Sequence, residues 1–266
     1  MSWLRVFFAG GMTSYRALFA WVNPWVFAPM LVAYPLFQIL FFAYLGRSAG
    51  VGSSFFLIGD SFVAAAITGL FGMGHAIGMG HAIGGERRFQ TLPILLASPT
   101  SRLALFLGRS VPTVVNGFAV AAIAFGLGTW ILGLHFQSAE LAKLALALVV
   151  SCFACTALGL CIGALGLRGR SVSVFADFIG ALMLIVSGAN VPFDRLPHIV
   201  RTIASGVPLT HGIDAARQVV NGASVGQVGN LLGAELGIAA AYFAVGVLLL
   251  RVFERQARAS GSFERF

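Results

Sequence analysis

The stretch GMGHAIGMGHAIGGERRFQTLPILLASPTSRLALFLGR, residues 72–109, changes from apolar to arginine-rich without a linker. A six-residue unit occurs twice in tandem, at 72–77 and 78–83, and Glu86-Arg87-Arg88 soon follows it. Glycines four residues apart, such as Gly74 and Gly78, allow two helix backbones to approach closely in lipid. The stretch is therefore typical of a close-packed transmembrane helix that ends at a basic, water-facing loop.

The composition of the chain is too apolar for a water-soluble protein. Of its 266 residues, 58% are hydrophobic and only 10% are charged, and the mean hydropathy is +0.91. Soluble domains carry roughly 25% charged residues, and a soluble chain of this size must leave a large share of its surface in water. We therefore predict an integral membrane protein.

Six apolar runs are long enough to cross a bilayer, because a transmembrane helix needs about 20 mostly apolar residues. These runs are 24–45, 55–83, 110–134, 144–167, 171–190 and 229–250. An even number of crossings places both termini on one side of the membrane. The predicted fold is an all-α membrane protein with six transmembrane helices, forming one domain over residues 1–266.

The first 20 residues mix aromatic and basic side chains, among them Trp3, Phe7 and Arg5. This pattern predicts an N-terminal amphipathic helix at the membrane interface, which Gly10-Gly11 is expected to break or bend. The following apolar run is long enough to span, and no small-residue cleavage site stands out after it. A cleavable signal peptide is therefore not expected.

The distribution of basic residues predicts cytoplasmic termini in a multi-pass protein of the cell (plasma or inner) membrane. With that orientation, twelve arginines face the cytoplasm and five basic residues face outward. The outward set is Arg47, Lys143, Arg195, Arg201 and Arg217. The net charge of +8 then reflects topology and attraction to anionic lipid, and we expect no nucleic-acid partner.

The histidines and cysteines do not form a convincing metal site. His75 and His81 are six residues apart, so they do not make the i, i+4 pair of a helical metal site, and no carboxylate joins them. We interpret them as part of helix packing, with a role in proton sensing or the substrate path as the alternative. The thiols of Cys152, Cys155 and Cys161 are interpreted as small apolar groups in the fourth span.

Acidic residues inside apolar runs are costly and therefore informative. Asp60 and Glu235 are expected near the outer ends of their spans, where contact with headgroups is sufficient. Asp177 lies deeper, which predicts a partner helix or water beside it. Asp177, Met183 and Asn190 are the candidates for the substrate path or a dimer contact.

Catalytic signatures of hydrolases and metalloproteases are missing from the sequence. The one lysine, Lys143, does not follow a glycine-rich loop, so a phosphate-binding P-loop is also missing. We therefore predict that the chain is not an enzyme and binds no cofactor. If ATP drives its function, a separate polypeptide must bind the nucleotide.

Two segments between the spans carry helical patterns. The loop at 86–102 contains a short amphipathic stretch, Phe89–Leu96, which Ser98-Pro99 ends. The outer segment at 191–228 contains two short apolar pieces, about 196–204 and 209–220, separated by prolines. Both pieces are too short to cross the membrane, and we predict a re-entrant helix pair whose backbone is covered by protein.

These segments resemble the membrane subunit of ABC-2 type exporters, the permeases of drug, antibiotic, lipid and polysaccharide export. The resemblance rests on ERRFQTLPILLASPTSR, SGANVPFDRLPHIV and PLTHGIDAARQVVNG, and it covers almost the whole chain. In the first loop the family tends to show Gly-Thr-Leu-Glu, where this chain has Gln90-Thr91-Leu92-Pro93.

The resemblance implies a function and two sets of site residues. The 86–102 loop would be a coupling helix that contacts a cytoplasmic ATPase, and the outer pair would be an extracellular gate. The implied coupling residues are Glu86, Arg87, Arg88, Leu92, Leu95, Leu96, Pro99 and Arg102. The implied gate residues are Pro192, Phe193, Pro197, Pro208, Leu209, His211 and Arg217.

The same resemblance implies the partners and the transport cycle. A separate nucleotide-binding subunit would hold ATP and Mg²⁺, and a second permease copy or a paralogue would complete a dimer in membrane lipid. The dimer would export a hydrophobic or amphipathic substrate, such as a drug, an antibiotic or a lipid, by alternating access. Alternatives are export of a polysaccharide or glycolipid, a proton-coupled secondary transporter, a lipid-acting enzyme and a scaffold. The substrate and the choice between homodimer and heterodimer stay open.

Overall fold

The computed structural model describes residues 3–21, 24–78, 102–165 and 172–260, and within them the chain is helical without strands. The long helices are α1 (Trp3–Trp21), α2 (Pro24–Ser48), α3 (Ser53–Gly78), α6 (Arg102–Leu132), α7 (Ser138–Leu165), α8 (Val172–Val186) and α11 (Val225–Ser260). Between α8 and α11 lie three short elements, η1 (Phe193–Arg195), α9 (His198–Ala204) and α10 (Thr210–Val220).

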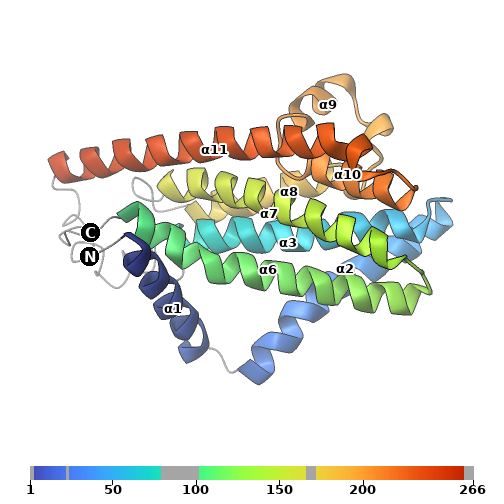
Figure 1. The fold of residues 1–266 in the computed structure, drawn as a ribbon, viewed down its shortest axis with the longest axis horizontal. Helices are drawn as coiled ribbons and strands as arrows, with labels where there is room; N and C mark the ends of the chain where they lie inside the picture. Colours follow the sequence, from blue (N-terminus) through green and yellow to red (C-terminus); the bar gives the residue numbers. More distant parts are fainter. Residues whose placement is uncertain (1–2, 22–23, 79–101, 166–171, 261–266) are drawn as a thin grey trace.

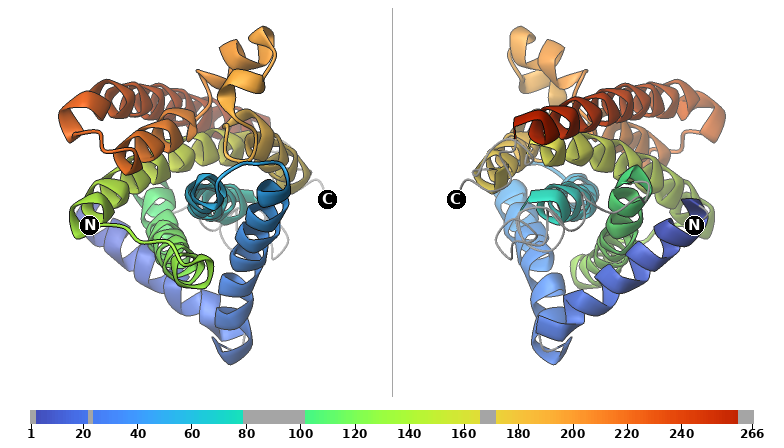
Figure 2. Two further views of the ribbon diagram at one scale, coloured as in Figure 1. Left: turned by 90° about the vertical axis from the view of Figure 1, so that its right-hand side faces the viewer. Right: turned by 90° about the vertical axis from the view of Figure 1, so that its left-hand side faces the viewer.

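Helix α3 is the centre of the bundle, with α2, α6, α7 and α8 packed around it (Figure 2). Its residues 56–63 are all buried, as expected of a helix that is hydrophobic on every side. Helix α11 packs against α7 on the outside of the bundle. Helices α1 and α6 begin, and α11 ends, at one end of the molecule, which we call the terminal end (Figure 1). Helices α9 and α10 lie toward the opposite end, the cap end.

Each of the six predicted spans overlaps a helix within the described residues. By length and apolar composition, three helical segments could cross a membrane, Val114–Leu132, Ser138–Leu165 and Val225–Phe253, in a search limited to the described residues. Ser53–Ala66 and Val174–Val186 form shorter apolar helices. Several helices continue past the predicted limits because hydropathy marks only the part of a helix inside the hydrocarbon core. The count of six crossings stays a prediction.

Helix α1 runs unbroken through Gly10-Gly11, so the expected break is wrong. The reason is its packing against α6. A Cβ on Gly108 of α6 would collide with the carbonyl oxygen of Phe7, and a Cβ on Gly11 would lie 2.9 Å from the carbonyl oxygen of Gly108. The glycines therefore allow the two backbones to touch.

Replacing Gly108 with alanine is expected to displace α1 and lower the free energy of unfolding by about 1–3 kcal/mol, the usual range for overpacking. Gly126→Ala is the matched control on the same helix, because its Cβ would meet open space. The control should be neutral or stabilising by up to about 1 kcal/mol. Thermal unfolding of both purified variants measures the difference, and equal midpoints would contradict the contact.

Candidate outer gate and membrane groove

The outer segment folds as the short helices that the prolines predict. Pro192 and Pro197 directly precede η1 and α9, and α10 follows Pro208-Leu209. Helix α9 has 7 residues and α10 has 11, far fewer than the roughly 20 needed to cross a bilayer. The predicted pieces at 196–204 and 209–220 are therefore helices in the structure, and their role as a gate stays a prediction.

The first turn of α10 is held by a carboxylate from another helix. Glu235 of α11 accepts hydrogen bonds from the backbone N–H of Leu209 at 2.5 Å and of Gly212 at 3.3 Å. Leu209 stands at the N-cap position and has no side-chain acceptor, so Glu235 satisfies the N–H of Gly212, which a Ser or Asp cap would otherwise bond. It also accepts from the N–H of Leu209 itself, as the glutamate of a capping box does. The expectation that Glu235 reaches the headgroups is wrong, because its side chain is fully buried.

Leu209 itself is held in an unusual backbone conformation. Its φ is +85°, a region that non-glycine residues rarely adopt. The side chain is fully buried within the main apolar cluster, and the hydrogen bond to Glu235 holds its N–H. A strained backbone conformation of this kind persists only where packing and hydrogen bonds around the residue hold it in place. Packing and the carboxylate together fix the turn that leads into α10.

Arg217 joins α10 to two other parts of the bundle. Its guanidinium donates hydrogen bonds to the carbonyl oxygens of Gly188 and Ala189, both at 2.8 Å, and of Phe55 at 3.3 Å. It also lies 3.5 Å from the centre of the Phe55 ring, a cation–π contact. Gly188, with a φ of +76°, lies just beyond the end of α8, where a cation is favourable.

The guanidinium of Arg217 stays charged although it is largely covered by protein. Burial lowers the pKa of Arg217 to about 10, while the carboxylates of Asp214 and Asp60 oppose this shift. At neutral pH the group is therefore protonated and can donate to all three carbonyl oxygens. In the sequence, only the family resemblance points to Arg217 as a site residue. In the structure, its guanidinium donates to three carbonyl oxygens.

Asp60 lies deep beside this contact and not at the headgroups, so the sequence-based expectation for it is wrong. It is 1% exposed, and its Oδ1 accepts a hydrogen bond from Nε2 of Gln38 at 3.0 Å. Asn190 lies next to the same carboxylate, and Arg217 supplies the opposite charge. Among the described residues, neither Oδ2 of Asp60 nor Oδ1 of Asn190 has a hydrogen-bond partner.

The other predicted site residues lie in different surroundings. Pro208 is buried, Phe193 is partly buried, and His211 Nε2 lies 3.0 Å from the carbonyl oxygen of Ser205. Asp177 is exposed on α8, whereas Met183 of the same helix is buried in the core. Asp177 therefore does not join the gate, and its assignment to a path or subunit contact stays a prediction.

The coupling loop cannot be compared with the structure. Glu86, Arg87, Arg88, Leu92, Leu95, Leu96 and Pro99 lie outside the described residues, as does His81. Arg102 is the first residue of α6, and His75 lies in the last turn of α3. All three cysteines are buried free thiols of α7, in keeping with their interpretation as packing groups.

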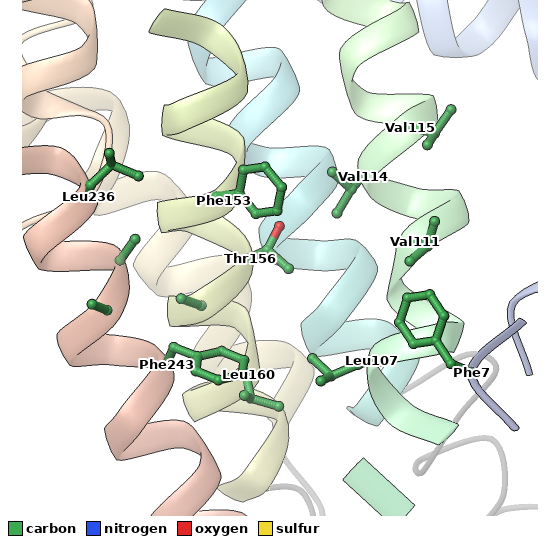
Figure 3. A pocket seen from close by; sticks show the side chains of 13 residues that line it. Phe7, Leu107, Val111, Val114, Val115, Phe153, Thr156, Leu160, Leu236 and Phe243 are labelled. Atoms are coloured by element: carbon green, nitrogen blue, oxygen red, sulfur yellow. The ribbon is translucent and has the colours of Figure 1, made fainter. Parts of the chain in front are cut away.

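A groove of about 590 Å³ lies among α1, α6, α7 and α11 (Figure 3). Among the described lining residues, the walls are apolar apart from Thr156. The lining residues are Phe7, Leu107, Val111, Val114, Val115, Phe153, Thr156, Ala157, Leu160, Leu236, Ala239, Ala240 and Phe243. Sequence reasoning missed the groove, because its residues come from four helices and each is an ordinary position in its own helix.

The helical architecture and the outer segment agree with a known family of transporters. The family model described as ABC-2 family transporter protein matches residues 46–248, which include every helix from α3 to α10. The chain belongs to the ABC-2 transporter family. The family is one of transporter permeases, so the chain is a membrane subunit of an ABC transporter.

Two curated relatives carry a more specific description. Both are described as probable multidrug ABC transporter permease YbhR, one from Escherichia coli strain K12 and one from Escherichia coli O157:H7. Each is 26% identical to the permease over 136 residues, which are 50% of this chain and 36% of the relative. The match thus spans about a third of the length of these relatives.

Proposed function

We propose that this permease exports a hydrophobic or amphipathic compound across the cell membrane, with both termini in the cytoplasm and with a separate ABC ATPase as its motor. The observation that carries the proposal is the set of hydrogen bonds by which Glu235 and Arg217 hold α10 at the cap end, which we interpret as a closure. A transporter that releases its substrate outward needs such a closure, which must hold while the substrate loads and must open later. The multidrug description of the relatives supports the substrate class.

The contacts suggest how the closure would open. Helix α10 is bonded to α11 through Glu235 and to the ends of α8 and α3 through Arg217. If α11 or α3 tilts relative to the others, these short contacts cannot all persist, and α10 would move as a unit. Interfaces of this kind switch between two arrangements and do not deform continuously.

The motor would act at the opposite side of the membrane. In the proposed arrangement the 86–102 loop inserts Leu92, Leu95 and Leu96 into a groove of the ATPase, with arginines at the rim, as in ordinary protein interfaces. ATP and Mg²⁺ would be held by that subunit. Two permeases, identical or paralogous, would form the transport path between them.

The double variant Leu95→Asp with Leu96→Asp tests the proposal. Two carboxylates in an apolar contact are expected to reduce co-purification with the partner ATPase by tenfold or more, and to abolish ATP-dependent export in vesicles. Leu141→Asp, at an exposed leucine near the start of α7, is the control and should behave as wild type. Normal co-purification and export by the double variant would refute the assigned contact.

A further inference from the structure

The groove among α1, α6, α7 and α11 is built to hold hydrocarbon. The polar atom in its wall, Oγ1 of Thr156, already donates to the carbonyl oxygen of Cys152 at 2.6 Å. The hydroxyl of Thr156 can still accept a hydrogen bond, but it would be the one polar side chain among the described lining residues to meet a polar ligand. Three of the four surrounding helices carry the membrane-spanning candidates, so the groove lies within the depth of the bilayer, where lipid is the solvent.

The groove is as tall as one leaflet of a membrane. On α6 it extends from Leu107 to Val115, eight steps that rise roughly 12 Å. Half of a hydrocarbon core that is roughly 30 Å thick is about 15 Å. It lies toward the terminal end, because Phe7 of α1 and Leu107 in the second turn of α6 line it (Figure 3). The groove therefore lies in the half of the bilayer that is on the side of the termini.

The width of the groove favours a thin, flexible chain. Ala157, Ala239 and Ala240 contribute small side chains, whereas Phe7, Phe153 and Phe243 are bulky. The groove offers about 590 Å³, which lies in the range of roughly 300–1,000 Å³ for bound small molecules.

Positive charge stands at the terminal end of the groove. Arg251 is exposed and lies eight residues beyond Phe243 on α11, roughly 12 Å further along the helix. Arg255 is also exposed, and Arg5 is exposed near the start of α1. The segment 251–258 carries three arginines and one glutamate. Basic residues at this position attract anionic lipid headgroups.

We propose that this groove is a binding site for an acyl chain of an anionic phospholipid, with the phosphate near Arg251. The site is separate from the contacts of Glu235 and Arg217, so its lipid is a bound component and not necessarily the cargo. Because lipid is the solvent at this depth, the bound chain is held by close packing against the groove walls, and the arginines add selectivity for negative headgroups.

The test uses a phosphatidylglycerol that carries a photoreactive diazirine in one acyl chain. The permease is reconstituted into phosphatidylcholine liposomes with a trace of this probe, irradiated, and digested for mass spectrometry. Labelled residues are expected among the groove positions of α6, α7 and α11. Unlabelled phosphatidylglycerol should compete at least fivefold better than phosphatidylcholine, and Arg251→Gln should reduce that preference to less than twofold while labelling persists.

A matched pair of variants on one helix isolates the groove. Ala240→Trp fills it and should reduce labelling by fivefold or more, whereas Ala241→Trp, exposed and outside the lining, should leave labelling within twofold of wild type. If Ala240→Trp fails to fold, Val115→Trp replaces it on the α6 wall, with Ile123→Trp as its exposed control.

Two results would overturn the proposal. Equal labelling of the filled and control variants would mean that the probe reports only bulk lipid. An unlabelled groove, with Ala240→Trp converting a dimer to a monomer, would mean that a second copy fills it. Because labelling needs neither ATP nor the ATPase, either failure would leave the proposed export function untouched.

Discussion

Replacing Glu235 with leucine is expected to lower the free energy of unfolding by about 2–6 kcal/mol, because two buried N–H groups lose their acceptor at about 1–3 kcal/mol each. Leucine has a similar size, so the change isolates the loss of the carboxylate. The N–H groups of Leu209 and Gly212 would remain covered by protein without a partner. The turn into α10, already unusual at Leu209, would then lose its main constraint.

The chain contains its own reporter for this measurement. Cys152, Cys155 and Cys161 are buried free thiols of α7, so a fluorogenic maleimide should react with them only as the permease unfolds. In a thermal ramp we expect the midpoint of Glu235→Leu to fall by about 5 °C or more. Glu235→Gln retains one acceptor oxygen and should show a smaller shift. A leucine variant with the wild-type midpoint would show that the carboxylate does not hold α10.

Replacing Arg217 with methionine is expected to cost about 3–5 kcal/mol, the range for removing one partner from a buried charged contact. The carbonyl oxygens of Gly188 and Ala189 and the Phe55 ring would lose the guanidinium. Asp60 would lose its compensating positive charge. The end of α10 would then be free to separate from α8 and α3, so we also expect export to fall by tenfold or more while the ATPase still co-purifies.

Two comparisons define the role of Arg217. Arg217→Lys keeps the charge but lacks the planar fork, so it should restore only part of the stability. Arg195→Met removes an exposed arginine of the same outer segment and should change the midpoint by less than about 1 °C, as surface substitutions usually do. If Arg217→Met and Arg195→Met have the same unfolding midpoint, the contact of Arg217 with the ends of α8 and α3 does not stabilise the protein.

The outer segment illustrates which parts of a site a sequence can predict. Pro192, Pro197 and Pro208 mark helix boundaries, because proline cannot continue a helix from within but fits its first turn. Those signals are local, so the two short helices were predictable. The partners of Glu235 and Arg217 are 23 to 162 residues away in the chain, and nothing local in the sequence encodes such pairs.

Asp60 and Glu235 show the same limit of prediction from sequence. Position along an apolar run suggested that Asp60 and Glu235 reach the headgroups, because a charge near the end of a span can extend toward water. That argument considers one helix at a time. In the bundle, Gln38 of α2 donates to Asp60, and the N–H groups of Leu209 and Gly212 at the start of α10 donate to Glu235. A buried charge is tolerated where such donors satisfy it.

By itself the sequence determined that the protein lies in a lipid bilayer, where its long helices are and which family it resembles. These properties follow from hydropathy, proline and glycine, which act over a few residues at a time. The tertiary structure alone decided which helix lies at the centre, which acid caps α10, which carbonyl oxygens Arg217 holds and where four apolar faces leave a groove. These features arise where groups from different helices come into contact. Those contacts decide whether a buried polar group is hydrogen-bonded and whether a space between side chains stays open.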